Sequence, residues 1–374
     1  MPAIDQFRTT AGLPVQRRAR AWTCYRGTGR FGALLTLAAA LWGGMHAPAS
    51  AQESKALPVV VAFAYKDSFD AYIVPKMKEL YKVDVQVSAF LSAEALARAI
   101  SQKANPQIAV FMLDEGPWQQ GSATGLWDKL DPAIMTNLAD VPAKYRSLSG
   151  DGVAVMTTLL GFLYDKGGLD ANNVAPPQSL NDLWKPEFKN RLAVPQFSST
   201  YAFGFLDIVN KVEKGNPKTF DKGFARLKEL RTNIRTFPGP AAQMIQLLQQ
   251  KEILVGWGPY FVAAQARKSG VPVSWVPASE GAVSVPNYAA VPRGVVDKQN
   301  AMRLINLVIA PEFQKMMAQR NGLAPINPKT DLSADATSDA PSSAVIQAAM
   351  LPSWEVYNAE RIRLNERWQR EIAN

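Results

Sequence analysis

Short apolar runs rich in β-branched residues alternate with amphipathic segments in the first third of this chain. Three runs predict strands, at residues 59–63, 83–87 and 108–113. The segments between them carry apolar residues at helical spacing, at residues 69–81 and 94–103, and Ser92 can cap the second helix. Because neighbouring parallel strands need a crossover between them, this order predicts a parallel α/β layer.

Residues 153–164 break that alternation. They have the composition of one long strand with no helix between its halves, so we expect this strand to pass from one lobe of the protein into another. A return crossing is expected at residues 288–291. The sequence therefore predicts an α/β protein of two lobes, each a mixed, mostly parallel sheet flanked by helices. Ligands of open α/β sheets bind beyond the carboxyl ends of the strands, which here lie in the cleft between the lobes.

The remaining segments predict the rest of both lobes. Helices are expected at residues 181–188, 198–214 (capped by Ser198), 220–232, 241–250, 299–320 (broken at Pro311) and 354–368, and strands at 191–195, 253–257 and 273–276. Residues 331–343 are rich in Ser, Asp and Ala and predict a surface connection. The expected domains are a signal peptide (1–51), the first lobe (52–158 and 289–334), the second lobe (159–288) and C-terminal helices packed on the second lobe (335–374).

The N-terminal segment has the features of an export signal. Its first 30 residues carry six Arg against one acid, Asp5, and an apolar run follows at residues 31–42. Ala49-Ser50-Ala51 then provides small residues suited to signal peptidase. We expect cleavage before Gln52 and a periplasmic product, because this apolar run is too short to span a bilayer as a resident helix. Arg17-Arg18 leaves both general secretory and twin-arginine export open.

Composition excludes much of the chemistry that side chains perform. The only Cys and the only His, Cys24 and His46, both lie in the segment expected to be removed. Without them the chain has no Ser-His or Cys-His nucleophile, no His/Cys zinc site and no disulfide. Removing the segment's six Arg and one Asp from 41 basic and 32 acidic residues leaves a charge of about +4. That balance does not indicate a nucleic-acid partner, and we expect no metal and no cofactor.

Five short motifs, in order and covering nearly the whole chain after the signal, carry a family resemblance. They are Leu160-Gly-Phe-Leu-Tyr164, the segment from Pro177 to Pro195 with its Asp-Leu-Trp-Lys-Pro core, Val276-Pro-Ala-Ser-Glu-Gly-Ala282, Val291-Pro292 and Gly322-Leu-Ala-Pro-Ile-Asn327. In this order the chain resembles type II periplasmic solute-binding proteins of ABC importers, in the branch that binds polyamines and ferric iron (extracellular solute-binding family 1).

The resemblance implies a monomeric, non-enzymatic protein that closes about a hinge. It would capture a small polar organic solute in the interlobe cleft and deliver it to an inner-membrane ABC permease. A polyamine such as putrescine or spermidine, or ferric iron, remains an alternative ligand. A sensory protein that presents its ligand-loaded lobes to a membrane receptor is a third possibility. A secreted hydrolase using an acid pair is the alternative class, and no nucleophile motif supports it.

The family's ligand residues are only partly present in this sequence. Polyamine binders carry an aromatic residue after the first strand, where this chain has Tyr65. They carry a Trp and an Asp where this chain has Val285 and Asn287, and two carboxylates where it has Phe197-Ser-Ser-Thr200. Ferric-iron binders use an adjacent Tyr pair, and no two Tyr are adjacent here. The acids left to hold one cationic end lie in first-lobe loops, at Asp67, Asp114 and Glu115.

The sequence therefore predicts a pocket for a solute that has one cationic end and one polar or anionic end. Ser198, Ser199 and Thr200 open a helix and offer N–H groups to an anion, although a plain N-cap explains them equally well. Trp257 lies between two Gly and predicts an exposed aromatic platform, with a core Trp as the alternative. The other candidates are Tyr260, close behind that strand, and Asn287 and Tyr288 at the return crossing. Asn287 is expected to join the second-lobe donors for the polar end of the solute. We expect Tyr65, Trp257 and Tyr288 to form an aromatic box.

Overall fold

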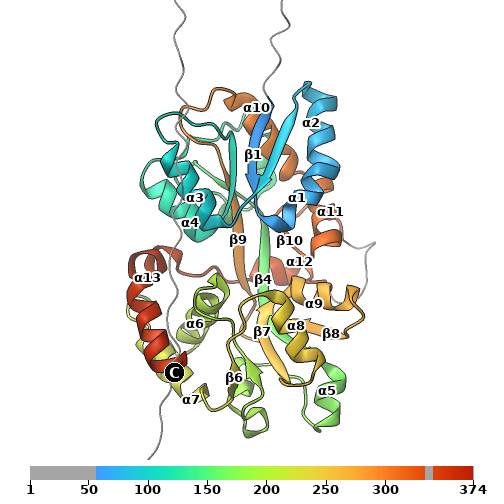
Figure 1. Cartoon of the computed structure of the whole chain (residues 1–374), viewed down its shortest axis with the longest axis vertical. Coiled ribbons are helices and arrows are strands. Elements are labelled where there is room, and N and C mark those ends of the chain that lie inside the picture. Colours follow the sequence, from blue (N-terminus) through green and yellow to red (C-terminus); the bar gives the residue numbers. More distant parts are fainter. Residues whose placement is uncertain (1–55, 333–339, 374) are drawn as a thin grey trace, which may run out of the picture. The chain divides into compact units, whose positions relative to one another are not determined.

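The computed structural model in Figure 1 describes residues 56–332 and 340–373. The predicted signal peptide and residues 333–339 of the predicted surface connection lie outside the described residues. Among the described residues, no helix has both the length and the apolar character needed to cross a membrane.

The first three strands pair in parallel, as predicted, in the order β2-β1-β3. They are β1 (Leu57–Val61), β2 (Val85–Ala89) and β3 (Val110–Asp114). Their connections contain α1 (Lys66–Ser68), a π turn at Phe69–Ile73, α2 (Val74–Tyr81) and α3 (Ser92–Ser101). The first four residues of β3 are fully buried, as expected for a strand covered on both faces.

Ser92 does not cap α3, contrary to the sequence prediction. The N-cap is Leu91, and Ser92 is the first helical residue. The Ser92 hydroxyl instead accepts a hydrogen bond of 3.1 Å from the backbone N–H of Asp114. It thereby ties the start of α3 to the end of β3, where the site described below begins.

Two long strands cross between the lobes, side by side in the centre of Figure 1. β4 (Val153–Asp165) pairs antiparallel with β9 (Val283–Ala290), with a bulge between Ala154 and Met156. β9 also pairs antiparallel with β3. The return crossing thus begins five residues before the predicted 288–291, because Pro286, which normally argues against an interior strand, is accommodated in it.

The second lobe repeats the alternation of strands and helices. Its strands are β5 (Leu192–Ala193), β6 (Ile234–Thr236), β7 (Val255–Pro259) and β8 (Val273–Val276). Its helices are α5 (Lys166–Ala171), α6 (Thr200–Val212), α7 (Asp221–Leu230), α8 (Ala241–Gln249) and α9 (Tyr260–Lys268), with 3-10 turns at Leu180–Trp184 and Pro186–Phe188. β5 pairs in parallel with β6 and β7, and β7 pairs antiparallel with β4.

The sheet is therefore mixed: parallel in the outer part of each lobe and antiparallel along the crossing strands. Its order is β2-β1-β3-β9-β4-β7-β5-β6, and β8 and β10 (Ala324–Pro325) both pair with β4. The remaining helices are α4 (Glu115–Ala123), α10 (Lys298–Val308), α11 (Pro311–Asn321), α12 (Ser343–Ala348) and α13 (Trp354–Trp368). The predicted helix pair around Pro311 is confirmed, since Pro311 is the first residue of α11.

Buried side chains form separate cores around the two halves of the crossing strands. One core contains β4 residues up to Met156 and β9 residues from Tyr288 onward. Two further cores contain β4 residues from Leu159 onward and β9 residues up to Val285. The two-lobed α/β architecture is thus confirmed, while the predicted domain boundaries at 158/159 and 288/289 remain a proposal.

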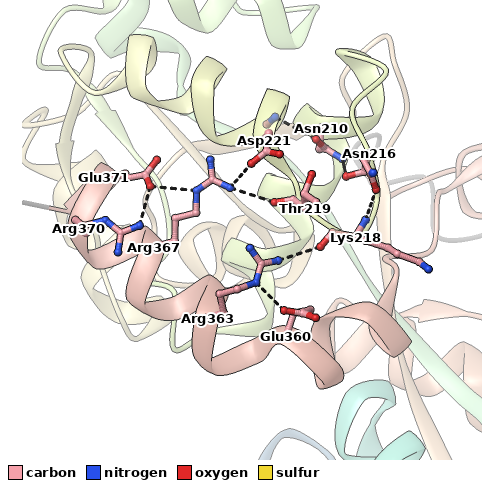
Figure 2. Close-up of polar contacts among 11 residues, drawn as sticks. Asn210, Asn216, Lys218, Thr219, Asp221, Glu360, Arg363, Arg367, Arg370 and Glu371 are labelled. Carbon is pink, nitrogen blue, oxygen red and sulfur yellow. Dashed lines mark hydrogen bonds and ion pairs between the residues drawn. The ribbon is translucent and has the colours of Figure 1, made fainter.

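Helix α13 packs on the second lobe. Trp368 stacks on Phe197 at 4.8 Å between ring centroids. Figure 2 shows Arg367 reaching the 216–221 loop, where it donates to the Thr219 carbonyl at 3.1 Å and pairs with Asp221 at 2.6 Å. Near its other end, Asn358 donates to the carbonyl of Gly116 in α4 at 3.0 Å. Helix α13 therefore contacts both lobes.

Candidate functional site

The site begins where β3 ends beside the crossing strand β9. Asp114, the last residue of β3, lies opposite Asn287 in the antiparallel register. The Asn287 amide donates to the Asp114 carboxylate at 3.2 Å. Burial raises the pKa of Asp114, and this effect outweighs the lowering by its hydrogen bonds with Asn287 and Ser92. Asn287 is only 6% exposed, and its own amide oxygen has no hydrogen-bond partner among the described residues.

Two tyrosines, one from each lobe, lie beside this carboxylate. Tyr65 ends the 3-10 turn Phe63–Tyr65 that follows β1, and it is 4% exposed. Burial raises its pKa most, followed by the negative charges of Asp114 and of Tyr201. Tyr201 lies in the first turn of α6, and burial and then Asp114 raise its pKa as well. Tyr65 and Tyr201 therefore lie within electrostatic reach of the Asp114 carboxyl.

A cavity of about 50 Å³ lies in the second lobe next to Tyr201. We call it the second-lobe cavity. It lies beyond the carboxyl ends of β5 and β7, and its wall includes the entry into α8 (residues 239–241) and the entry into and first turn of α9 (residues 259, 261 and 262). Tyr201 and Trp257 also line it, and none of its described lining residues is acidic. The Tyr201 ring meets Phe261 edge to face at 6.4 Å.

Trp257 is buried, so the predicted exposed platform is wrong. Its side chain is 1% exposed and packs against Phe162 and Phe205, with ring centroids 5.6 and 5.2 Å away. Its strand, β7, lies in the interior of the sheet between β4 and β5. The flanking glycines serve packing on the opposite face, because a Cβ at Gly256 would lie 2.5 Å from the sulfur of Met244. The Trp257 indole N–H has no hydrogen-bond partner among the described residues.

Tyr288 and Glu115 lie outside the surroundings of the Asp114 carboxylate. Side chains alternate along a strand, so Tyr288 points to the face of β9 opposite Asn287, where it stacks on Trp118 at 4.2 Å. Glu115 opens α4 and is 7% exposed. Burial, followed by the negative charge of Glu115, raises the pKa of Tyr288. The structure therefore does not assemble Tyr65, Trp257 and Tyr288 into an aromatic box.

Burial raises the pKa of Glu115 to about 8, outweighing the lowering by the Gln119 amide and the Trp354 indole. Gln119 donates to one carboxylate oxygen at 3.3 Å. The other oxygen is buried and has no hydrogen-bond partner of ordinary geometry among the described residues. Glu115 therefore belongs to the contact between α4 and α13 and lies apart from the group around Asp114.

The remaining candidates are scattered. Ser199, not Ser198, caps α6, because its hydroxyl accepts from the Tyr201 N–H at 3.2 Å; Ser198 is exposed and Thr200 opens the helix. Tyr260 packs edge to face on Trp275 at 5.7 Å within another core. Asp67 is exposed on α1. Within residues 56–332 and 340–373, no three Asp, Glu, His or Cys side chains converge closely enough to hold a metal ion.

Sequence reasoning missed Tyr201 and Phe261, which line the second-lobe cavity. Each stands in the first turn of a helix that follows a strand, at positions 201 and 261. An aromatic residue at such a position faces the carboxyl edge of the sheet, and this was the signal available in the sequence.

Residues 108–351 match the family of bacterial extracellular solute-binding proteins. The match spans more than half of the chain, and the chain belongs to this family. The resemblance to periplasmic solute-binding proteins drawn from the five motifs is thereby confirmed.

Relatives and solved structures agree with this assignment. The spermidine/putrescine-binding periplasmic protein of Salmonella typhimurium is 26% identical over 159 residues, covering 41% of this chain and 45% of that protein. The gamma-aminobutyric acid-binding protein of Pseudomonas aeruginosa is 27% identical over 219 residues, covering 56% of this chain and 59% of that protein. The chain thus matches about half the length of these relatives. A crystal structure of an ABC transporter protein from Clostridium perfringens superimposes with a TM-score of 0.75 at 22% identity, over 84% of this chain and 99% of that one.

Proposed function

We propose that this chain is the solute-binding component of an ABC importer and captures a small organic solute that carries one ammonium group. The observation that carries this proposal is the partly buried Asp114, which is paired with Asn287 and lies within electrostatic reach of Tyr65 from one lobe and Tyr201 from the other. In this family's two-lobed fold, a ligand held by groups from both lobes favours closure around it.

This group has the chemistry to receive an ammonium ion. An ammonium has three N–H donors and no acceptor, so it needs several acceptors when it leaves water. Asp114 supplies the charge, and the unpaired amide oxygen of Asn287 supplies a second acceptor. The rings of Tyr65 and Tyr201 add favourable cation–π contact.

The second lobe argues against a second ammonium. None of the described residues lining the second-lobe cavity is acidic, and a desolvated ammonium without a carboxylate partner is costly. The relatives' names cover both kinds of ligand, since spermidine and putrescine are polyamines and gamma-aminobutyric acid is an amino acid with a single ammonium group. Polyamine binding therefore remains the second candidate, favoured by the Salmonella relative.

The proposal includes cleavage before Gln52, a periplasmic location and delivery to an inner-membrane permease. Members of the family are transport-associated solute-binding proteins, and we propose no catalytic step for this chain.

Titration calorimetry on the Asp114→Asn variant tests the proposal, with 4-aminobutanoate, butylamine, putrescine and spermidine as probes. Loss of a buried charge partner should weaken binding of the bound amines by about 30-fold or more, or about 2 kcal/mol. The control is Asp67→Asn, which neutralises an exposed acid of the same lobe and should leave affinity unchanged. Equal affinities of wild type and Asp114→Asn for every amine bound would refute Asp114 as the cation site.

A further inference from the structure

Two helices of the second lobe begin at the wall of the second-lobe cavity. Helix α8 starts at Ala241 after Pro240, and α9 starts at Tyr260 after Pro259. The first N–H groups of a helix have no partner within that helix, and the aligned peptide dipoles make this end positive. Both helices are nine residues long. Positive potential from two helices therefore converges on one cavity.

A buried side-chain donor lies on the same wall. Trp257 lines the cavity at 1% exposure, and its indole N–H has no hydrogen-bond partner among the described residues. Buried donors are nearly always paired, because an unpaired one loses its water without compensation. Since none of the described lining residues is acidic, an acceptor brought by a ligand would satisfy this N–H.

The cavity also adjoins the proposed ammonium site. Tyr201 lines the cavity, and burial, followed by the charge of Asp114, raises the pKa of that same tyrosine. The ammonium site belongs to β3 and β9, whereas the unpaired donors belong to α8, α9 and β7. A single solute that reaches both must carry its two polar ends on opposite sides of a spacer.

We propose that the second-lobe cavity is a subsite for a carboxylate, so that the solute class is a zwitterion with separated charges, such as an ω-amino acid. This inference rests on the proposed function, because it takes the ammonium end to lie at Asp114. The carboxylate accepts from the Trp257 indole and from the first N–H groups of α8 and α9. The spacer passes Tyr201 and the apolar side chains of the cavity wall.

Calorimetry with matched probes tests the subsite. The probes are 4-aminobutanoate, 5-aminopentanoate and 6-aminohexanoate, with butylamine lacking the carboxylate and putrescine replacing it by a second ammonium. At least one ω-amino acid should bind tenfold or more tighter than butylamine and putrescine, because hydrogen bonds to a charged group are the stronger kind.

Two variants remove single donors. Trp257→Phe deletes the indole N–H but keeps an aromatic ring, and Ala241→Pro deletes the first N–H of α8 at a position where proline suits a helix. Each should lower the affinity for the ω-amino acid about tenfold and leave that for butylamine unchanged. Trp184→Phe is the control, because this indole already donates to the Arg226 carbonyl at 3.0 Å and does not line the cavity.

The outcomes separate the two proposals. Equal affinities for butylamine and all three ω-amino acids would overturn the carboxylate subsite and leave ammonium capture at Asp114 intact. The carboxylate subsite would also be overturned if both variants lost as much affinity for butylamine as for the ω-amino acid, because the two residues would then act by packing alone. Failure of every amine to bind would overturn the proposed function together with the subsite.

Discussion

Glu115 should make the protein less stable as the pH rises, and Glu115→Gln should remove this dependence. Burial raises the pKa of this carboxyl from the ordinary 4.5 to about 8. Between these values the folded state holds a proton that the unfolded state has released, so the free energy of unfolding falls as the pH rises through this window. At about 1.4 kcal/mol for each tenfold change in proton affinity, the full penalty above pH 8 is on the order of 5 kcal/mol.

The assay is urea denaturation followed by tryptophan fluorescence at half-unit steps from pH 4.5 to 9. Glu115→Gln should match the wild type within about 1 kcal/mol at pH 4.5, where both side chains are neutral, and exceed it by several kcal/mol at pH 9. The control is Glu312→Gln, which changes an exposed acid in the first turn of α11. Parallel stability profiles for wild type and Glu115→Gln across this range would refute the reasoning, because the buried carboxyl would then titrate as it does in the unfolded chain.

Three further outcomes are expected. Trp257→Ala should lower the free energy of unfolding by about 3–5 kcal/mol in chemical denaturation, because it empties a packed interior site; a change under 1 kcal/mol would contradict the observed burial. Asp114→Asn should raise the thermal midpoint of the ligand-free protein at pH 8, because burial raises the pKa of this acid and its ionisation works against folding. A midpoint below that of the wild type would contradict this expectation. Intact-mass analysis of the exported protein should give a chain beginning at Gln52, and a chain that begins before residue 31 would exclude the proposed cleavage.

The strands and helices were predictable because each depends on local periodicity. The first three strands and the break at Pro311 were found to within about two residues. The predicted return crossing begins too late in the sequence. A rule that treats proline as a strand breaker excludes the first half of β9, which contains Pro286. Which residues form a strand is a local property, whereas the tolerance of a proline within it depends on the partner strands.

The candidate site was predictable only in part. Asp114 and Tyr65 each follow a first-lobe strand, and strand order brings those positions to one edge. Asn287 was expected among the second-lobe donors but pairs with Asp114, because the register of β9 against β3 places it opposite that residue. Trp257 was misjudged because glycine neighbours indicate either exposure or close packing, and only the opposite face of the sheet decides between them. Here Met244 fills the space beside Gly256.

Asp114 and Glu115 are adjacent in sequence but lie in different surroundings. Asp114 ends β3 and faces Asn287 and the tyrosines, whereas Glu115 begins α4 and faces the contact with α13. Glu115 is buried and Asp114 partly buried, and burial raises the pKa of both, so both oppose folding when ionised without a partner. Asp114 contributes to the raised pKa of Tyr201, which lines the second-lobe cavity, so a ligand bound beside this tyrosine can supply the missing cation. The proposed ligand would therefore relieve a cost present in the empty protein, and its binding should strengthen as the pH rises and Asp114 loses its proton.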